Sequence, residues 1–392
     1  MKTSFFVKIL SAFLTFSLLL CFCASGANLS ESVSRDTNVD LGLTCKSAVL
    51  MEASTGEVLY AHNESEALPP ASVTKVMTLL LVMEAIESGA LNYTDMVTAS
   101  ANAASMGGSQ IYLKEGETMS VEDLLKSVVI ASANDAAVAL AEHIAGSEEA
   151  FVAQMNERAR ELGMSSTNFE NTNGLDDTVE NHVTSAMDIA IMSRELIKHK
   201  KILEYSSTWM DTIRDGSFGL TNTNRLVRFY NGATGLKTGS TSKAKFCISA
   251  TASRDGMELI CVIMGAETRD VRNAEAKTLL DWGYSNFELY KCEGASLGSI
   301  KVTGGVESET DIAHSGITLV VKKGDAKKIQ TCVDLPESVS APIKKGDTVG
   351  ILKLHIDGKE KGCIDIVSLS SVEKISFWEL FAKIIKGFFL LS

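Results

Sequence analysis

The stretch Pro69-Pro70-Ala71-Ser72-Val73-Thr74-Lys75 opens a long apolar run that continues to about Glu87 and is followed by Gly89. Proline just before such a run and glycine just after it are typical of helix ends, so the sequence predicts a helix that begins at Ser72. Residues three apart on a helix are neighbours, with Cβ atoms about 5–6 Å apart. The serine hydroxyl therefore lies within reach of the Lys75 ammonium.

This pair has a possible chemical use. A serine is a poor nucleophile until a base removes its proton, and a lysine can be that base when burial or nearby cations lower its pKa. Free backbone N–H groups at the helix start would also favour developing negative charge at Ser72. Such a pair is common by chance, however, and taken alone an N-cap serine beside a solvated lysine is the simpler interpretation.

A second motif, Ser132-Ala133-Asn134, falls between two predicted helices. A serine and an amide at such a point could relay a proton and hold a carbonyl or N–H group of a substrate. The alternative is a plain N-cap for the helix that begins near Asp135.

A third motif, Lys237-Thr238-Gly239-Ser240-Thr241, opens the strand run of a predicted hairpin. A lysine there can pair with a carboxylate, and the hydroxyls of Thr238 and Thr241 can add hydrogen bonds. Gly239 would let the backbone of a substrate come close. The alternative is an exposed strand start with turn residues.

The three motifs together match, in order and in the elements that carry them, the set found in penicillin-binding proteins and class A β-lactamases. The chain resembles low-molecular-mass penicillin-binding proteins, the serine-type D-alanyl-D-alanine carboxypeptidases (peptidase S11-like). The likeness covers nearly the whole chain and includes the stretches 171–175 and 235–239. One departure is Ser-Ala-Asn in place of Ser-Asp-Asn, at a middle position to which no chemistry is assigned.

The resemblance implies that the protein removes the terminal D-alanine from the peptidoglycan stem pentapeptide and binds β-lactam antibiotics covalently. It also implies roles for individual residues. Ser72 forms the acyl-enzyme, Lys75 is the general base and Ser132 serves the proton relay. Asn134 holds substrate, Lys237 contacts the terminal carboxylate, and the substrate site is completed by Thr238, Gly239, Ser240 and Thr241. The backbone N–H groups of Ser72 and Ser240 form an oxyanion hole.

Histidine and cysteine offer no competing site. None of the six histidines lies in the three motifs, so a Ser-His-Asp triad lacks a candidate base. The cysteines form no CxxC pairs and no metal-ligand spacings, so neither metal nor cofactor is expected. Export would permit disulfides, and the pair we consider is Cys332 with Cys363.

The order of elements predicts an α+β fold: an antiparallel sheet assembled from both ends of a domain, flanked by helices and carrying a helical insert. This domain covers residues 40–288, and short alternating runs then predict a small all-β domain over residues 291–369. The expected hairpins are 47–53 with 57–63 and 243–253 with 257–266, and the expected helices are 72–87, 121–131, 135–145, 148–162, 183–199 and 268–282.

The chain begins with the features of a secretory signal peptide over residues 1–27. Lys2 and Lys8 precede the apolar run 9–23, and small residues follow at 24–27. An uncleaved membrane anchor is the alternative. The formal net charge of −12 argues against nucleic acid as a partner, and the bulk charge does not favour an anionic membrane.

Residues 371–392 predict an amphipathic helix. Its five charged residues exclude a membrane span, and we expect it to lie along the outer face of the cytoplasmic membrane. Packing of the helix on the β domain is the alternative. The apolar face holds Ile375, Phe377, Trp378, Phe381, Ile384, Ile385, Phe388 and Phe389.

Three other functions use the same residues. A β-lactamase of class A would carry a Glu-x-x-Leu-Asn stretch, and none lies between Asn134 and Lys237. A DD-endopeptidase or transpeptidase differs in pocket shape, which the sequence does not reveal. A non-catalytic scaffold that binds the cell wall would not need intact Ser72 and Lys75.

Overall fold

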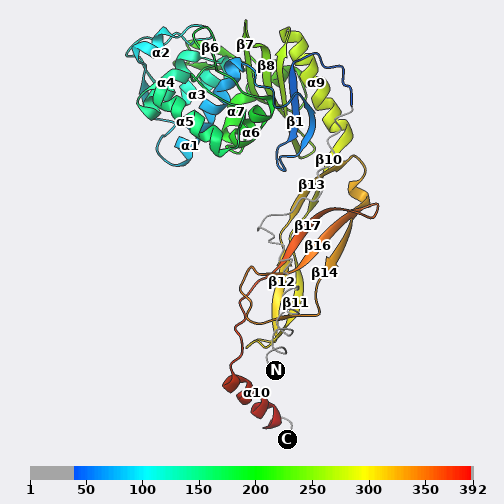
Figure 1. The fold of residues 1–392 in the computed structure, drawn as a ribbon. Coiled ribbons are helices and arrows are strands. Elements are labelled where there is room, and N and C mark those ends of the chain that lie inside the picture. Colours follow the sequence, from blue (N-terminus) through cyan, green and yellow to red (C-terminus); the bar gives the residue numbers. More distant parts are fainter. Residues whose placement is uncertain (1–38, 390–392) are drawn as a thin grey trace, which may run out of the picture. The chain divides into compact units, whose positions relative to one another are not determined.

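The computed structural model describes residues 39–389, and the predicted signal peptide at residues 1–27 lies outside them. The chain forms two compact units (Figure 1). The first unit contains the described residues up to Cys292 together with Thr318–Lys328, and the second contains Glu293–Ile317 and the residues from Ile329 onward.

The first unit is built on a five-stranded antiparallel sheet. Side chains along each strand alternate between two hydrophobic cores, because successive side chains of a strand point to opposite faces of the sheet. On one strand, Val49 and Met51 enter one core, and Ala48 and Leu50 enter the other. In spatial order the strands are β2 (Val58–His62), β1 (Ser47–Glu52), β9 (Met257–Ala266), β8 (Lys245–Arg254) and β7 (Ala233–Thr241).

Helices cover both faces of this sheet (Figure 1). The long helix α9 (Arg269–Asn286) packs on β8 and β9, and the helical block between β2 and β7 packs on the other face through α6. The block comprises η1 (Ala71–Thr74), α1 (Lys75–Glu87), β3 (Met96–Thr98), α2 (Ala101–Ser105), β4 (Thr118–Ser120), α3 (Val121–Lys126), η2 (Ser127–Ala131), α4 (Asn134–Ala145), α5 (Glu148–Glu161), α6 (Ala186–Leu196), α7 (Lys201–Ser206), β5 (Met210–Ile213), β6 (Phe218–Thr221) and α8 (Leu226–Phe229).

The predicted fold class, an antiparallel sheet flanked by helices with a helical insert, is confirmed. Two elements differ from their predicted form. The run from Ser72 begins as a 3₁₀ turn, η1, and becomes α-helical only at Lys75. The helix predicted from residue 183 begins at Ala186, because the backbone of Val183 pairs with Asn168 and that of Thr184 with Leu68.

The third motif also lies differently from its prediction. Lys237 does not open the second hairpin, since the motif forms the end of its own strand, β7, which pairs along its length with β8. The motif thereby occupies an edge strand of the sheet, beside η1.

The second unit contains a six-stranded sheet, and a C-terminal helix follows it. The run 316–322, which the sequence assigned to the small β domain, instead forms β13 (Ile317–Lys322) and pairs with β10 (Phe287–Cys292). A 3₁₀ turn, η3 (Ala326–Lys328), follows β13. The six strands in spatial order are β14 (Gln330–Asp334), β16 (Thr348–Ile356), β17 (Lys359–Ser368), β12 (Glu309–His314), β11 (Ala295–Thr303) and β15 (Ser338–Ser340).

The disulfide considered from the sequence is wrong, because neither Cys332 nor Cys363 takes part in a disulfide bond. Cys332 on β14 lies opposite Lys353 on β16, and Lys353 lies opposite Cys363 on β17. Two strand spacings of about 4.8 Å separate the two cysteines. A disulfide needs Cα atoms within about 7 Å, so β16 keeps the thiols apart.

The C-terminal helix is α10 (Phe377–Phe389). Its apolar face is exposed: Phe377 retains 73% and Trp378 75% of their accessible surface. None of the helices in the described part of the chain has the length and apolarity to cross a bilayer. The side chains of Phe388 and Phe389, which the sequence placed on the same face, lie outside the described residues.

Candidate active site

Ser72 and Lys75 meet at the junction of η1 and α1. Side chains three residues apart eclipse one another in a 3₁₀ turn, which brings the pair together. The Lys75 Nζ donates to Ser72 Oγ at 3.0 Å, to Asn134 Oδ1 at 2.5 Å and to the carbonyl of Asn173 at 2.8 Å. Asn134 and Asn173 therefore hold the Lys75 amine in place beside the Ser72 hydroxyl.

Burial makes Lys75 unusual among lysines. Its side chain is fully enclosed, and burial, followed by the nearby charge of Lys237, holds the pKa of Lys75 well below its ordinary value, with Asp135 acting in the opposite direction. A lysine whose pKa is lowered loses its proton more readily than an ordinary lysine, and the neutral amine can then accept one. The requirement stated for a lysine base is thus met by the surroundings of Lys75.

Ser132 occupies a left-handed conformation, with φ of 64°, between the π turn η2 and helix α4. Few non-glycine residues adopt such a conformation, which marks a position held by its surroundings. Its Oγ accepts a hydrogen bond from Lys237 Nζ at 2.8 Å. The N-cap alternative for this motif is wrong, because the N-cap residue of α4 is Ala133, which makes no side-chain capping bond.

The amide of Asn134 is held at both ends. Its Oδ1 accepts from Lys75, and its Nδ2 donates to the carbonyl of Gly107 at 2.7 Å. The backbone N–H of Asn134 donates to the carbonyl of Ser109 at 2.7 Å. The segment 106–117, which we call the 106–117 loop, therefore sets the orientation of the amide that faces Lys75.

Lys237 and Thr238 lie on β7 next to this group. The buried Lys237 Nζ donates to Ser132 Oγ and to the carbonyl of Thr238, and burial followed by the charge of Arg272 lowers the pKa of Lys237 to about 7. Thr238 Oγ1 donates to Thr223 Oγ1 at 2.8 Å. Most of the hydrogen-bonding capacity of Lys237 is thus used inside the protein.

Gly239 has a packing role that the sequence did not reveal. A Cβ at this position would lie 2.8 Å from both Pro70 O and Ser72 N. Real Cβ atoms do not approach backbone this closely, so only glycine lets β7 lie against η1. Close approach of a substrate at Gly239 stays a prediction from the sequence.

The last two residues of the motif differ in surroundings. Ser240 is exposed and lines the same pocket as Ser72. Thr241 does not line that pocket, and its Oγ1 donates to Asp176 Oδ2 at 2.5 Å while accepting from the N–H of Ala244.

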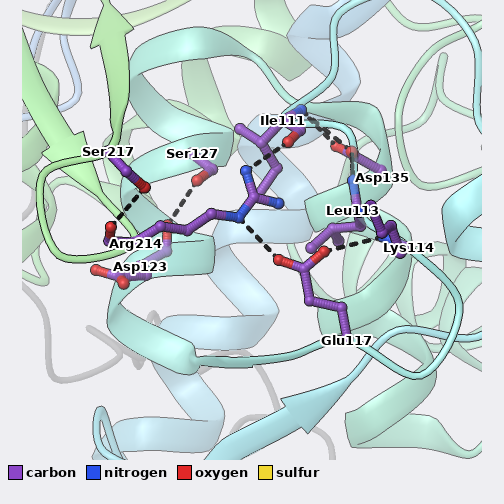
Figure 2. A network of polar contacts seen from close by, with 9 residues as sticks. All are labelled: Ile111, Leu113, Lys114, Glu117, Asp123, Ser127, Asp135, Arg214 and Ser217. Atoms are coloured by element: carbon purple, nitrogen blue, oxygen red, sulfur yellow. Dashed lines mark hydrogen bonds and ion pairs between the residues drawn. The ribbon is translucent and has the colours of Figure 1, made fainter.

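A polar network fixes the 106–117 loop (Figure 2). The Asp135 carboxylate accepts from the N–H groups of Ile111 and Leu113. Arg214, in the turn between β5 and β6, donates through Nη1 to the carbonyl of Ile111 at 2.8 Å and through Nε to Glu117 at 2.8 Å. The loop is thereby tied to α4 on one side and to the β5–β6 hairpin on the other.

His182 contacts η1, the turn that carries Ser72, and no sequence signal indicated this contact. Its Nδ1 accepts from the N–H of Glu170, so the proton is on Nε2, which lies 2.7 Å from Thr74 Oγ1 and donates to it. Burial lowers the pKa of His182 to about 4. This histidine is therefore neutral and braces the turn through Thr74, and it makes no hydrogen bond with Ser72.

The site opens into a pocket of about 600 Å³. Five of the predicted residues line it, whereas Lys75, Asn134 and Lys237 are buried. No cluster of histidine, cysteine or acidic residues in the described part of the chain could hold a metal ion. The predicted residues that line the pocket are Ser72, Ser132, Thr238, Gly239 and Ser240.

Comparison with known proteins agrees with this geometry. Residues 33–268 match the family model described as D-alanyl-D-alanine carboxypeptidase, and residues 284–374 match that of the penicillin-binding protein 5 C-terminal domain. The chain is 42% identical to D-alanyl-D-alanine carboxypeptidase DacF of Bacillus subtilis over 94% of its own length and 96% of that protein.

Solved structures are similar as well. Penicillin-binding protein 5 from Haemophilus influenzae superposes with a TM-score of 0.76 at 32% identity, covering 85% of this chain and 98% of that one. Penicillin-binding protein D2 from Listeria monocytogenes, solved in an ampicillin-bound form, gives 0.58 at 32% identity, covering 63% of this chain and all (100%) of that one.

Proposed function

The chain belongs to the family of serine-type D-alanyl-D-alanine carboxypeptidases, which are penicillin-binding proteins, and we propose that Ser72 is its nucleophile and Lys75 the general base. The family and the enzyme class predicted from the motifs are confirmed. The observation that carries the residue roles is the 3.0 Å contact between Ser72 Oγ and the buried, pKa-lowered amine of Lys75.

The first step is acylation. A neutral Lys75 amine has one lone pair and two N–H groups, and the N–H groups can stay on Asn134 and Asn173. The lone pair takes the Ser72 proton as Oγ attacks the carbonyl carbon of the D-Ala–D-Ala peptide bond. The backbone N–H groups of Ser72 and Ser240 would stabilise the oxyanion, since both residues line the pocket.

The second step releases D-alanine. The C–N bond breaks, and the proton taken by Lys75 reaches the leaving amine through the hydroxyl of Ser132, which Lys237 holds in place. Water then attacks the acyl-enzyme and restores Ser72. In this scheme Asn134 orients Lys75 and substrate. Thr238 and Gly239 line the side of the pocket that takes the terminal carboxylate, and Lys237 and Thr241, which do not line it, belong to the same strand, β7.

The proposed substrate is the peptidoglycan stem pentapeptide, and β-lactams are proposed to acylate the same serine. Release of D-alanine from a pentapeptide, together with labelling by a fluorescent penicillin, tests both. Wild-type protein should do both, and Ser72→Ala should do neither. Absence of label on the wild-type protein would contradict the acyl-enzyme, and rapid turnover of the penicillin would identify a β-lactamase instead.

We also propose that the protein is exported through residues 1–27 and attached to the outer face of the cytoplasmic membrane by α10. Support comes from the exposed aromatic face of that helix and from Lys383 and Lys386 in its sequence. Val372 is buried with Val302 and Ile343, so the test deletion should begin at residue 377, and not at 371 as the predicted segment does. The deletion should release active enzyme from membranes, and continued attachment would contradict the proposal.

A further inference from the structure

Three arginines stand in the wall of the pocket that holds Ser72: Arg225, Arg269 and Arg272. The chain as a whole is acidic, with a formal net charge of −12, so this local gathering of cations is opposite to the bulk charge. Within residues 39–389, neither Arg225 nor Arg269 has an acidic side chain at ion-pair distance. The two exposed guanidinium groups are therefore available to a ligand.

Arg272 differs from the other two because it is fixed. Only 2% of it is exposed, and its guanidinium donates to Asn273 Oδ1 and to the carbonyl of Cys247. Burial, then the charges of Arg269 and Arg225, lowers the pKa of Arg272 to about 10, and Asp270 partly opposes the effect. The three cations thus lie close enough to repel one another, which an anion in the pocket would relieve.

One carboxylate already has a place in the proposed reaction. The terminal carboxylate of the substrate belongs to the leaving D-alanine and lies beside Lys237 and Thr238. Arg272 lines the pocket together with Thr238, the residue next to Lys237, and its charge lowers the pKa of Lys237, so it lies on the same side of the site. Arg225 and Arg269, which act on Arg272, are further cations on this leaving-group side.

The pocket has room for a larger leaving group. Its volume of about 600 Å³ lies in the range that holds a drug-sized ligand, and Trp209 and the exposed Phe229 line it together with Arg225. A methyl side chain, as in D-alanine, would fill little of this space. An acidic group reaching along the wall would meet both exposed guanidinium groups.

We propose that Arg225 and Arg269 form a second anion subsite, which recognises a carboxylate on the leaving group in addition to the one next to the scissile bond. The inference rests on the proposed function, because it takes the leaving group to lie on the side of Lys237. The substrate class is a peptide whose leaving residue, or the strand attached to it, carries an extra acidic group. Such a substrate should react faster than a neutral one of equal size.

Two synthetic peptides that differ only in charge test the inference: one ends in D-Ala-D-Glu and the other in D-Ala-D-Gln. We expect kcat/KM for release of the last residue to be about fivefold higher with D-Glu at low salt, the size of a partly exposed charge pair. The preference should shrink in about 0.5 M salt, where screening is strong. It should disappear in the Arg225→Gln, Arg269→Gln double variant.

Arg228 provides the matched control. It lies three residues from Arg225 on α8, stacks on Trp209 and Phe229, and does not line the pocket, so Arg228→Gln should keep the D-Glu preference. Thermal unfolding of each variant establishes that it is folded. The comparison of the D-Glu and D-Gln peptides on wild-type protein does not depend on the folding of any variant.

The outcomes separate the two proposals. Equal rates for D-Glu and D-Gln at low salt, in wild-type protein that releases D-alanine from a pentapeptide, would overturn the second subsite alone. A preference that survives in the double variant would overturn its assignment to these arginines. Failure to release any residue, without penicillin labelling, would instead overturn the proposed function.

Discussion

The surroundings of Lys75 and Lys237 disfavour the charged form of both lysines and so lower their pKa values. Burial dominates in both, and each also feels the next cation along the site: Lys237 acts on Lys75, and Arg272 acts on Lys237. Removing one of these charges should therefore change the pKa of the neighbouring lysine. This coupling makes pH the most direct probe of the individual residues.

The rate at which penicillin labels Ser72 should rise with pH through the lowered pKa of Lys75 and level off well below about pH 10, the ordinary lysine value. The sign follows because only the neutral amine accepts the serine proton. Labelling rates from about pH 5 to 11 at constant ionic strength measure the midpoint. A rate that keeps rising to about pH 10 would contradict Lys75 as a pKa-lowered base.

Removing the charge of Arg272 should affect Lys237 first. Arg272→Gln removes a repulsion that lowers the pKa of Lys237, so that pKa should rise above about 7. Any limb of the pH profile near neutrality should then move to higher pH. An unchanged profile would show that this limb does not report on Lys237. Arg228→Gln serves as the control for loss of an arginine that does not line the pocket.

At the scale of elements, two packing contacts shape the site. Strand β7 lies against η1 because Gly239 has no side chain, and the 106–117 loop is held on α4 and on the β5–β6 hairpin by Asp135 and Arg214 (Figure 2). In both cases, an element distant in sequence decides the position of a reacting group.

Gly239→Ala should lower the acylation rate strongly, by about 100-fold or more, because the new methyl group meets the backbone of Pro70 and Ser72 and displaces Ser72, the proposed nucleophile. Gly219→Ala on β6 is the matched control, since a Cβ there meets nothing within 4 Å. Penicillin labelling rates and thermal unfolding of both variants check this. Equal rates for the two variants would rule out the close contact as the reason for glycine.

Arg214→Gln should slow acylation about three- to tenfold, the size of one lost hydrogen bond of ~1 kcal/mol. The loosened loop would leave Asn134 a poorer acceptor for the charged Lys75, so the pKa of Lys75 should fall further and the rising limb should move to lower pH. Asp211→Asn is the control, because Asp211 pairs with Lys126 from the same hairpin. A slower reaction with an unshifted profile would argue for a purely structural role of Arg214.

At the scale of the whole molecule, the two units are not consecutive along the chain. Residues Thr318–Lys328 come after the first strands of the second unit, yet they belong to the first, where Val320 is buried in the core beneath α9. The stability of the first unit, which carries Ser72, therefore depends on a segment that the chain reaches late.

Val320→Ala should destabilise the first unit by about 1–2 kcal/mol through the lost apolar contacts. Penicillin labelling after brief heating should then fail at a lower temperature than in the wild type. Val333→Ala on β14 is the control, since Val333 is 46% exposed and belongs to the second unit. Identical inactivation temperatures for the two variants would contradict a structural role of Thr318–Lys328 in the first unit.

Much about this protein follows from sequence alone. The periodicity of apolar residues predicted the order of strands and helices, since it depends on local geometry. The three motifs predicted the family, because their chemistry and spacing are specific, and five of the residues that they named line one pocket. Three-residue spacing also predicted the contact between Ser72 and Lys75, which are neighbours on the chain.

Tertiary structure alone decided the rest, because it depends on contacts between segments distant in sequence. The state of Lys75 comes from burial and from Asn173, and the place of Gly239 comes from η1. Arg269 and Arg272 of α9 line the same pocket as Arg225, which precedes α8. Strand β16 separates Cys332 from Cys363. No local pattern encodes these distances, since the folded chain alone brings such residues together.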